Sequence, residues 1–210
     1  MKLILFFPLF LLPCFAFAQT KPIRYFDENM STISKKEYEQ DRKNPNFLHL
    51  EFDLDTAKYY VKTTREHSGQ MPAETLQLLK KDLEATSQTA IPAEQLIVID
   101  YYPGPDPCNT SGTTDKSWIK ADHAEYQKAL HKSGPVFQCY IYSRKEGLER
   151  YEGIYAWYPD LHDRVRQLFF KMHYPCGSVV VIRPDGKYKS YYGEYASETV
   201  LAMIGALREH

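Results

Sequence analysis

Of the 210 residues only four are cysteines, and no two of them stand in a C-x-x-C pair. The sequence also has no G-x-S-x-G, no Walker-type phosphate loop and no G-x-G-x-x-G, which removes the main hydrolase and nucleotide-binding signatures. After the first segment, no apolar run approaches the about 18 residues that a membrane span needs. A strong net charge is missing as well, with 26 basic and 27 acidic residues, so charge gives no case for binding nucleic acid or an anionic membrane.

The first 18 residues have the pattern of a cleavable secretory signal. Lys2 supplies a positive charge, residues 3–12 are apolar, and residues 16–18 form an A-x-A cleavage pattern. We therefore expect a signal peptide over 1–18 and a mature protein that begins near Gln19, is periplasmic or secreted, and has no stable membrane insertion.

Two alternatives for this segment are less favoured. A retained membrane anchor is usually followed by a basic stop-transfer cluster, and no such cluster follows Ala18. A lipoprotein would carry its lipid on Cys14, but Pro13 is not the small residue that such processing sites favour.

Three cysteines remain after cleavage, namely Cys108, Cys139 and Cys176. In an oxidising compartment, one disulfide and one buried thiol are the simplest interpretation of an odd number, and counting does not say which two pair. Cys139 alternates with two apolar residues in a predicted strand, which favours a buried core thiol.

Residues 19–90 predict a small N-terminal α+β elaboration. Ser34 and Glu37 match the capping box, which predicts a short helix. The other expected elements are a strand over 22–26, a hairpin of strands over 47–52 and 57–64, and a helix that opens at Pro72.

Residues 91–210 change character and predict an α/β mixed sheet with helices on both faces. Helices between the first three strands predict crossover connections, and a Pro-Asp-Gly turn over 184–186 predicts an antiparallel final pair. In chain order we expect a strand over 95–102, a helix over 118–132, a strand over 136–143, a helix over 159–172, strands over 179–182 and 187–192, and a helix that begins at Ser197.

This order, together with the segment G-S-V-V-V-I-R-P-D-G-K over 177–187, resembles the C-terminal half of the thioredoxin-like superfamily. In the redox members of that family the first strand leads into a C-x-x-C motif, whose first thiol is the attacking thiolate. The equivalent stretch here has a single cysteine, Cys108, two residues later than the family spacing, and reads C-x-x-S with Ser111 in place of the resolving thiol. The matching family position implies that Asp100 is a buried acid that assists thiol chemistry, and the alternative, which we favour, is a polar residue at a strand end.

The resemblance also implies a second loop beside Cys108. The family places a cis-proline just before its third core strand, and here Gly177 stands near that position, with Pro175 and Cys176 just before it. Both loops converge at one end of the sheet, which implies a disulfide between Cys108 and Cys176, either structural or redox-active.

Two further groups of residues are candidate sites. The histidines, such as His123, His131, His162 and His173, lack the spacing of metal ligands, so we expect no metal and no cofactor. The aromatic stretch 151–159 is typical either of a partner- or glycan-binding surface or of core packing.

The missing C-x-x-C and the altered proline site favour an exported binding or interaction module, whose partner is another exported or envelope protein. The alternative is a periplasmic thiol-disulfide oxidoreductase that uses Cys108 as nucleophile, Cys176 as resolving thiol and Asp100 as a proton-transfer aid. A third hypothesis is an antitoxin-like partner of a secreted protein.

Overall fold

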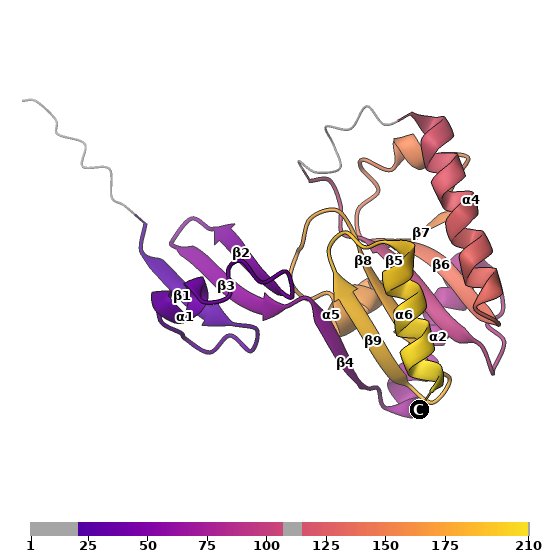
Figure 1. Ribbon diagram of the computed structural model, residues 1–210, viewed down its shortest axis with the longest axis horizontal. Coiled ribbons are helices and arrows are strands. Elements are labelled where there is room, and N and C mark those ends of the chain that lie inside the picture. Colours follow the sequence, from indigo (N-terminus) through magenta and orange to yellow (C-terminus); the bar gives the residue numbers. More distant parts are fainter. Residues whose placement is uncertain (1–20, 107–114, 210) are drawn as a thin grey trace, which may run out of the picture.

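The structure is a computed structural model that describes residues 21–106 and 115–209. It contains a three-stranded sheet and a six-stranded sheet (Figure 1). The smaller sheet stands to one side of the larger one, which carries helices on both of its faces (Figure 1). No helix within these residues is long and apolar enough to cross a membrane.

The smaller sheet is built from the first part of the chain, as predicted. Its strand order is β1-β3-β2, in which β1 lies parallel and β2 antiparallel to β3. Ser34 and Glu37 form the predicted capping box, and Tyr38 of the following helix is buried. The elements are β1 (Ile23–Asp27), α1 (Lys35–Glu39), β2 (Phe47–Asp53) and β3 (Lys58–Thr64).

The larger sheet has the strand order β4-β9-β8-β5-β6-β7. The central strand β5 is buried along its whole length, as its apolar run predicts for a strand covered on both faces. The strands are β4 (Glu66–Gln70), β5 (Leu96–Tyr102), β6 (Val136–Tyr142), β7 (Trp157–Pro159), β8 (Ser178–Ile182) and β9 (Lys187–Tyr192).

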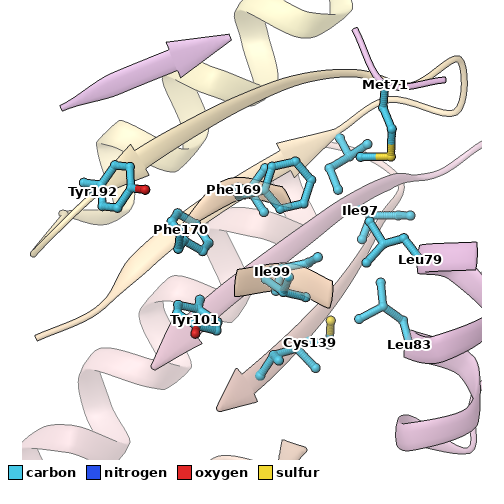
Figure 2. Packing of buried hydrophobic residues seen from close by; sticks show 14 of the residues in the cluster. Met71, Leu79, Leu83, Ile97, Ile99, Tyr101, Cys139, Phe169, Phe170 and Tyr192 are labelled. Atoms are coloured by element: carbon cyan, nitrogen blue, oxygen red, sulfur yellow. The ribbon is translucent and has the colours of Figure 1, made fainter. Parts of the chain in front are cut away.

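Two pairs of helices cover the two faces of this sheet. Alternate residues of β5 contribute to two separate core clusters, with Ile97 and Ile99 in one and Leu96 and Val98 in the other. One face is covered by α2 (Ala73–Ser87) and α5 (Arg164–Phe169), and Figure 2 shows part of its packing. The other face is covered by α4 (Lys116–Lys132) and α6 (Ser197–Arg208). The structure therefore confirms the predicted α/β class, a mixed sheet flanked by helices, and the thioredoxin-like assignment stays an expectation from the sequence.

The connection into β8 differs from the prediction. The pair β5 and β6 is parallel, with α4 as the crossover, but β8 runs antiparallel to β5. The short strand β7 lies parallel to β6 and carries the chain back to the same end of the sheet. The chain thus enters β8 beside the end of β5, and Ser178 pairs with Tyr101. The turn at 184–186 then reverses the chain into β9 as predicted.

The helix predicted over 159–172 is wrong in extent. The chain forms only a 3-10 turn (Leu161–Asp163) and then α5, with positive φ angles at His162 and Asp163. The carboxylate of Asp160 accepts hydrogen bonds of 2.9 Å from the backbone N–H groups of Val165 and Arg166. These bonds satisfy the free amides of the new helix start, so the helix begins after the turn.

The first part of the chain also contributes to the larger sheet. Strand β4 pairs with β9, and Leu76, Leu79 and Leu83 of α2 pack in the same core cluster as Ile97. The division into an elaboration over 19–90 and a thioredoxin-like domain over 91–210 stays a prediction. The structure places β4 in the larger sheet and packs α2 against its core, although both elements precede residue 91.

Candidate functional site

Asp100 lies at the C-terminal end of β5 and is only 2% exposed. In the sheet it pairs with Tyr140 of β6 and Val179 of β8. Because side chains alternate along a strand, Asp100 faces the same side as Leu96 and Val98, which is the side covered by α4 and α6. A carboxyl group is thus buried between the sheet and these two helices.

Three neutral side chains donate hydrogen bonds to this carboxylate. The hydroxyl of Tyr126 in α4 lies 3.1 Å from Oδ1, and the amide of Gln138 in β6 lies 2.5 Å from Oδ2. The hydroxyl of Tyr195, just before α6, also donates to Oδ1. Each donor comes from a different element, so the carboxylate connects α4, β6 and the start of α6.

The pKa of Asp100 is raised to about 6, because burial disfavours the charged form. The hydrogen bonds from Tyr195, Gln138 and Tyr126 act in the opposite direction and lower that pKa. Burial, and then the charge of Asp100, raise the pKa values of Tyr126 and Tyr195, so both hydroxyls keep their protons. The carboxyl is therefore a group that changes its charge near neutral pH while its tyrosine donors do not.

A chain of polar contacts leads from Asp100 to the surface of α4. The amide of Gln127 donates to Gln138 at 2.9 Å and lies 3.3 Å from the hydroxyl of Tyr140. That hydroxyl is hydrogen-bonded to Nδ1 of His123 at 3.0 Å. Partial burial lowers the pKa of His123, which favours its neutral form.

Two adjoining clefts open beside this network. The first, of about 420 Å³, is lined by Asp100, Tyr126 and Tyr140 among others. The second, of about 640 Å³, is lined by Trp118, Cys176 and other residues. Both clefts share four lining residues, which are Asp122, Tyr155, Tyr195 and Ala196. We call the two together the tyrosine cleft.

Aromatic rings form much of the wall of the tyrosine cleft. The ring of Tyr155 lies 4.6 Å from that of Tyr140 and 5.1 Å from that of Tyr151. Trp157 contacts Tyr140 at 5.2 Å from the side of β7. Within the aromatic stretch 151–159, Trp157 packs against Tyr140 of the sheet, as core packing predicts, while Tyr151 and Tyr155 line a cleft. A binding role of this stretch stays a prediction.

The structure brings some of the predicted site residues together. Cys176 and Gly177 line the second cleft, and Asp100 lines the first. Gly177 lies beside β5, since a Cβ atom there would make an ordinary van der Waals contact of 3.5 Å with the carbonyl oxygen of Tyr101. Pro175 directly precedes Cys176 and accepts a 3.2 Å hydrogen bond from the N–H of Gly177. The loop before β8 thus lies at the end of β5, as expected.

Cys176 is disulfide-bonded and has a φ angle of 79°, in the left-handed region that non-glycine residues rarely adopt. Cys108 and Ser111 lie outside the described residues, so the pairing of Cys108 with Cys176 and the role of Ser111 stay predictions. No described peptide bond is cis, and the match of Gly177 to the family's cis-proline position stays an expectation.

Cys139 is a free, buried cysteine, as the sequence predicted. Its sulfur lies 3.9 Å from the carbonyl oxygen of Val98, and the side chain belongs to the core cluster under α2 and α5 (Figure 2). Burial raises the pKa of the thiol, so the reactive thiolate form is disfavoured. Cys139 is therefore a core residue and contributes nothing to the cleft.

Two of the histidines considered as metal ligands contact carboxylates instead. His162 lies 3.2 Å from the carboxylate of Asp82, and His173 lies 2.8 Å from that of Asp106. Within the described ranges no group of three or more His, Cys, Asp or Glu side chains is placed to hold a metal ion.

Sequence reasoning identified Asp100 but missed its donors. Tyr126 stands four residues before Leu130 on the inward face of α4, and Gln138 alternates with Tyr140 along β6. Those spacings were a usable signal for Tyr126 and Gln138. Tyr195 lies in a loop 95 positions from Asp100, and no local pattern indicates its contact.

Comparison with solved structures finds a secreted disulfide oxidoreductase of Mycobacterium tuberculosis that is homologous to E. coli DsbE. It is 13% identical, and the likeness covers 58% of this chain and 92% of that chain at a TM-score of 0.36. Neither the protein-family models nor the curated proteins compared with the sequence gave a match. A likeness this distant carries no argument about fold or activity.

Proposed function

We propose that this protein is an exported binding module, mainly non-catalytic, that holds a segment of another exported or envelope protein in the tyrosine cleft. The observation that carries the proposal is Trp118, which lines the second cleft and is 61% exposed. The apolar ring of a tryptophan exposed at the edge of a cleft is in contact with water in the isolated protein. Burying that ring under a partner is favourable and contributes hydrophobic free energy to binding.

The other side chains around Trp118 are of the kind that dominate protein interfaces. Tyr151, Tyr155 and Arg150 line the same cleft. Tyrosine, tryptophan and arginine are enriched among the residues that contribute most to binding free energy, because they give a large contact area together with polar groups. The cleft lies where β5 ends and β8 begins, in the six-stranded sheet, and a site built on strands favours a preformed geometry.

The described cysteines support binding more than catalysis. Cys139 is sealed in the core, and Cys176 is held in a disulfide. Asp100 is hydrogen-bonded to three neutral donors, so its carboxylate is already satisfied. A disulfide also agrees with the export that residues 1–18 predict.

One observation favours the alternative, a thiol-disulfide oxidoreductase. Cys176 is disulfide-bonded and lines a cleft that adjoins the one lined by Asp100, whose pKa is about 6. In that hypothesis a reduced pair of Cys108 and Cys176 gives two electrons and two protons to a substrate disulfide, which becomes a dithiol while the pair forms its own disulfide.

An insulin-reduction assay with dithiothreitol separates the two functions. Mature wild-type protein and the Cys176→Ser variant are expected to give the same background rate as dithiothreitol alone. In parallel, a bait that carries the wild-type protein is expected to capture an envelope protein of its own organism, and Trp118→Ala is expected to lose it. Leu54→Ala is the control, because Leu54 is 54% exposed and does not line the cleft. If wild type reduces insulin faster than dithiothreitol alone and Cys176→Ser does not, the protein is an oxidoreductase and the proposed binding function is wrong.

A further inference from the structure

Acidic side chains surround the tyrosine cleft. Asp122 lines both of its parts, Glu125 and Glu198 line the first, and Glu194 lines the second. All four are exposed at the surface, and they come from α4, from the segment before α6 and from the first turn of α6. We call these four residues the acidic rim.

The acidic rim lacks compensating charge. None of its four carboxylates makes an ion pair within the residues that the structure describes, whereas Asp53 is paired with Lys21 and Asp82 with Arg164. Among the described residues that line the cleft, Arg150 is the only basic one. Like charges focused at a concave surface repel each other and attract a cationic ligand.

The wall of the cleft supplies a second interaction for a cation. Tyr151, Tyr155 and Tyr195 present aromatic rings there, and an aromatic face attracts a cation through its quadrupole. The protein's own Arg150 already makes such a contact, because its guanidinium carbon lies 5.4 Å from the centroid of the Tyr151 ring. The same wall therefore already holds one guanidinium group.

We infer that the tyrosine cleft recognises a basic side chain, lysine or arginine, on the exported partner. The ammonium or guanidinium group is held between the tyrosine rings and the acidic rim, and the apolar stem of the side chain lies against Trp118. This inference rests on the proposed function and adds to it the chemical class of the partner's contact residue. Because the whole chain is nearly neutral, its net charge does not reveal this local preference.

Titration with four short peptides tests the inference. Each peptide has the same glycine and serine background, and its central residue is lysine, arginine, norleucine or glutamate. Calorimetry with the mature protein is expected to give about 10-fold tighter binding of the lysine and arginine peptides than of the norleucine peptide. The advantage is expected to shrink when salt is raised from about 50 to 500 mM, because exposed charges are screened.

Charge-neutralising variants locate the effect. Asp122→Asn and Glu194→Gln are each expected to lower the affinity for the lysine peptide by about 3- to 10-fold and to leave the affinity for the norleucine peptide unchanged. Glu74→Gln is the matched control, because Glu74 is an exposed carboxylate in the first turn of α2 and does not line the cleft. Thermal unfolding of all three variants is expected to match that of wild type, which shows that the fold is intact.

The outcomes separate this inference from the proposed function. Equal or tighter binding of the norleucine or glutamate peptide overturns the basic side chain as ligand, and so does no binding of the lysine and arginine peptides at millimolar concentration. In either case the proposed binding function is retained if capture of the envelope protein still depends on Trp118. If Trp118→Ala captures the envelope protein as well as wild type does, the proposed binding function itself is wrong.

Discussion

The hydroxyl of Tyr195 donates a hydrogen bond to the carboxylate of Asp100, across 95 positions of the chain. The contact joins the segment before α6 to the centre of the sheet, directly beside the tyrosine cleft. It is also where burial and hydrogen bonding act on the pKa of Asp100 in opposite directions.

Tyr195→Phe removes this donor and little else. A hydrogen bond to an ionised carboxylate is stronger than one to a protonated carboxyl, so the loss in unfolding free energy is expected to be about 2 kcal/mol at pH 7 and about 1 kcal/mol at pH 4. Because the bond lowers the pKa of Asp100, that pKa is expected to rise in the variant. Urea unfolding at the two pH values measures the first effect, and carbon NMR titration of the Asp100 carboxyl measures the second. An equal loss at both pH values would contradict the charged hydrogen bond.

Asp100→Asn tests the pKa itself. In the folded protein Asp100 keeps its proton up to about pH 6, whereas the unfolded chain releases it near 3.8. The folded state therefore binds more protons between these values, and this group lowers the stability as pH rises from about 4 to about 6. The shift of about two pKa units corresponds to about 3 kcal/mol. The unfolding free energy of Asp100→Asn minus that of wild type is therefore expected to increase by about 3 kcal/mol from pH 4 to pH 7.

The comparison of the two proteins across pH is the control for this prediction. Other titrating groups contribute to both curves and cancel in the difference, because the substitution changes only one of them. Asn keeps the shape of the side chain and can still accept from Tyr126 or Tyr195. A difference that is flat between pH 4 and pH 7, or that runs the other way, would show that the pKa of Asp100 is not raised.

Patterns in the sequence predicted the parts of the fold that depend on local rules. The capping box at Ser34 and the turn at 184–186 use short-range hydrogen bonding, and both are present. The uninterrupted apolar run of β5 predicted a fully buried strand. The extent of the helix predicted over 159–172 failed, because the side chain of Asp160 bonds the amides of Val165 and Arg166, and hydrophobic spacing does not report such contacts.

Edge strands were missed for a related reason. Strand β4 is mostly exposed and contains polar residues and a glycine, so it has no apolar alternation to reveal it. It is a strand because β9 offers it backbone partners. In the site, Asp100 and the loop of Cys176 and Gly177 were identified from the sequence. The acidic rim was not, because its members come from separate elements that only the fold brings together.

Cys139 gives a prediction about thiol chemistry. The thiol is buried in the core, and burial raises its pKa, so in the native protein it should not react with a disulfide reagent such as DTNB. In 6 M guanidinium chloride it should react at once, as an ordinary exposed thiol. Cys139→Ala is expected to abolish that reaction, to cost about 1 to 2 kcal/mol of stability through the small cavity, and to leave peptide binding unchanged. Rapid labelling of Cys139 in the native state would mean that the core under α2 and α5 opens readily.

Arg65 gives a prediction about how the two sheets are joined. It stands between β3 and β4, and its side chain donates to the carbonyl oxygens of Pro45 at 3.0 Å and Tyr192 at 2.9 Å. The guanidinium carbon also lies 5.6 Å from the ring centroid of Tyr174 and 5.4 Å from that of Tyr191. One side chain therefore connects the loop before β2 with the end of β9.

Arg65→Ala is expected to lower the unfolding free energy by about 2 to 3 kcal/mol, because both carbonyl oxygens lose a charged donor. Arg65→Lys should recover only part of this loss, since a single ammonium group cannot reach two carbonyls with the fork geometry of a guanidinium. Arg42→Ala is the control, because Arg42 forms an exposed ion pair with Glu39 and such pairs contribute little. Hydrogen exchange is expected to show faster opening of β1, β2 and β3 in Arg65→Ala while β5 and β8 keep their protection. If all strands lost protection equally, Arg65 would stabilise the whole molecule rather than the junction of its two sheets.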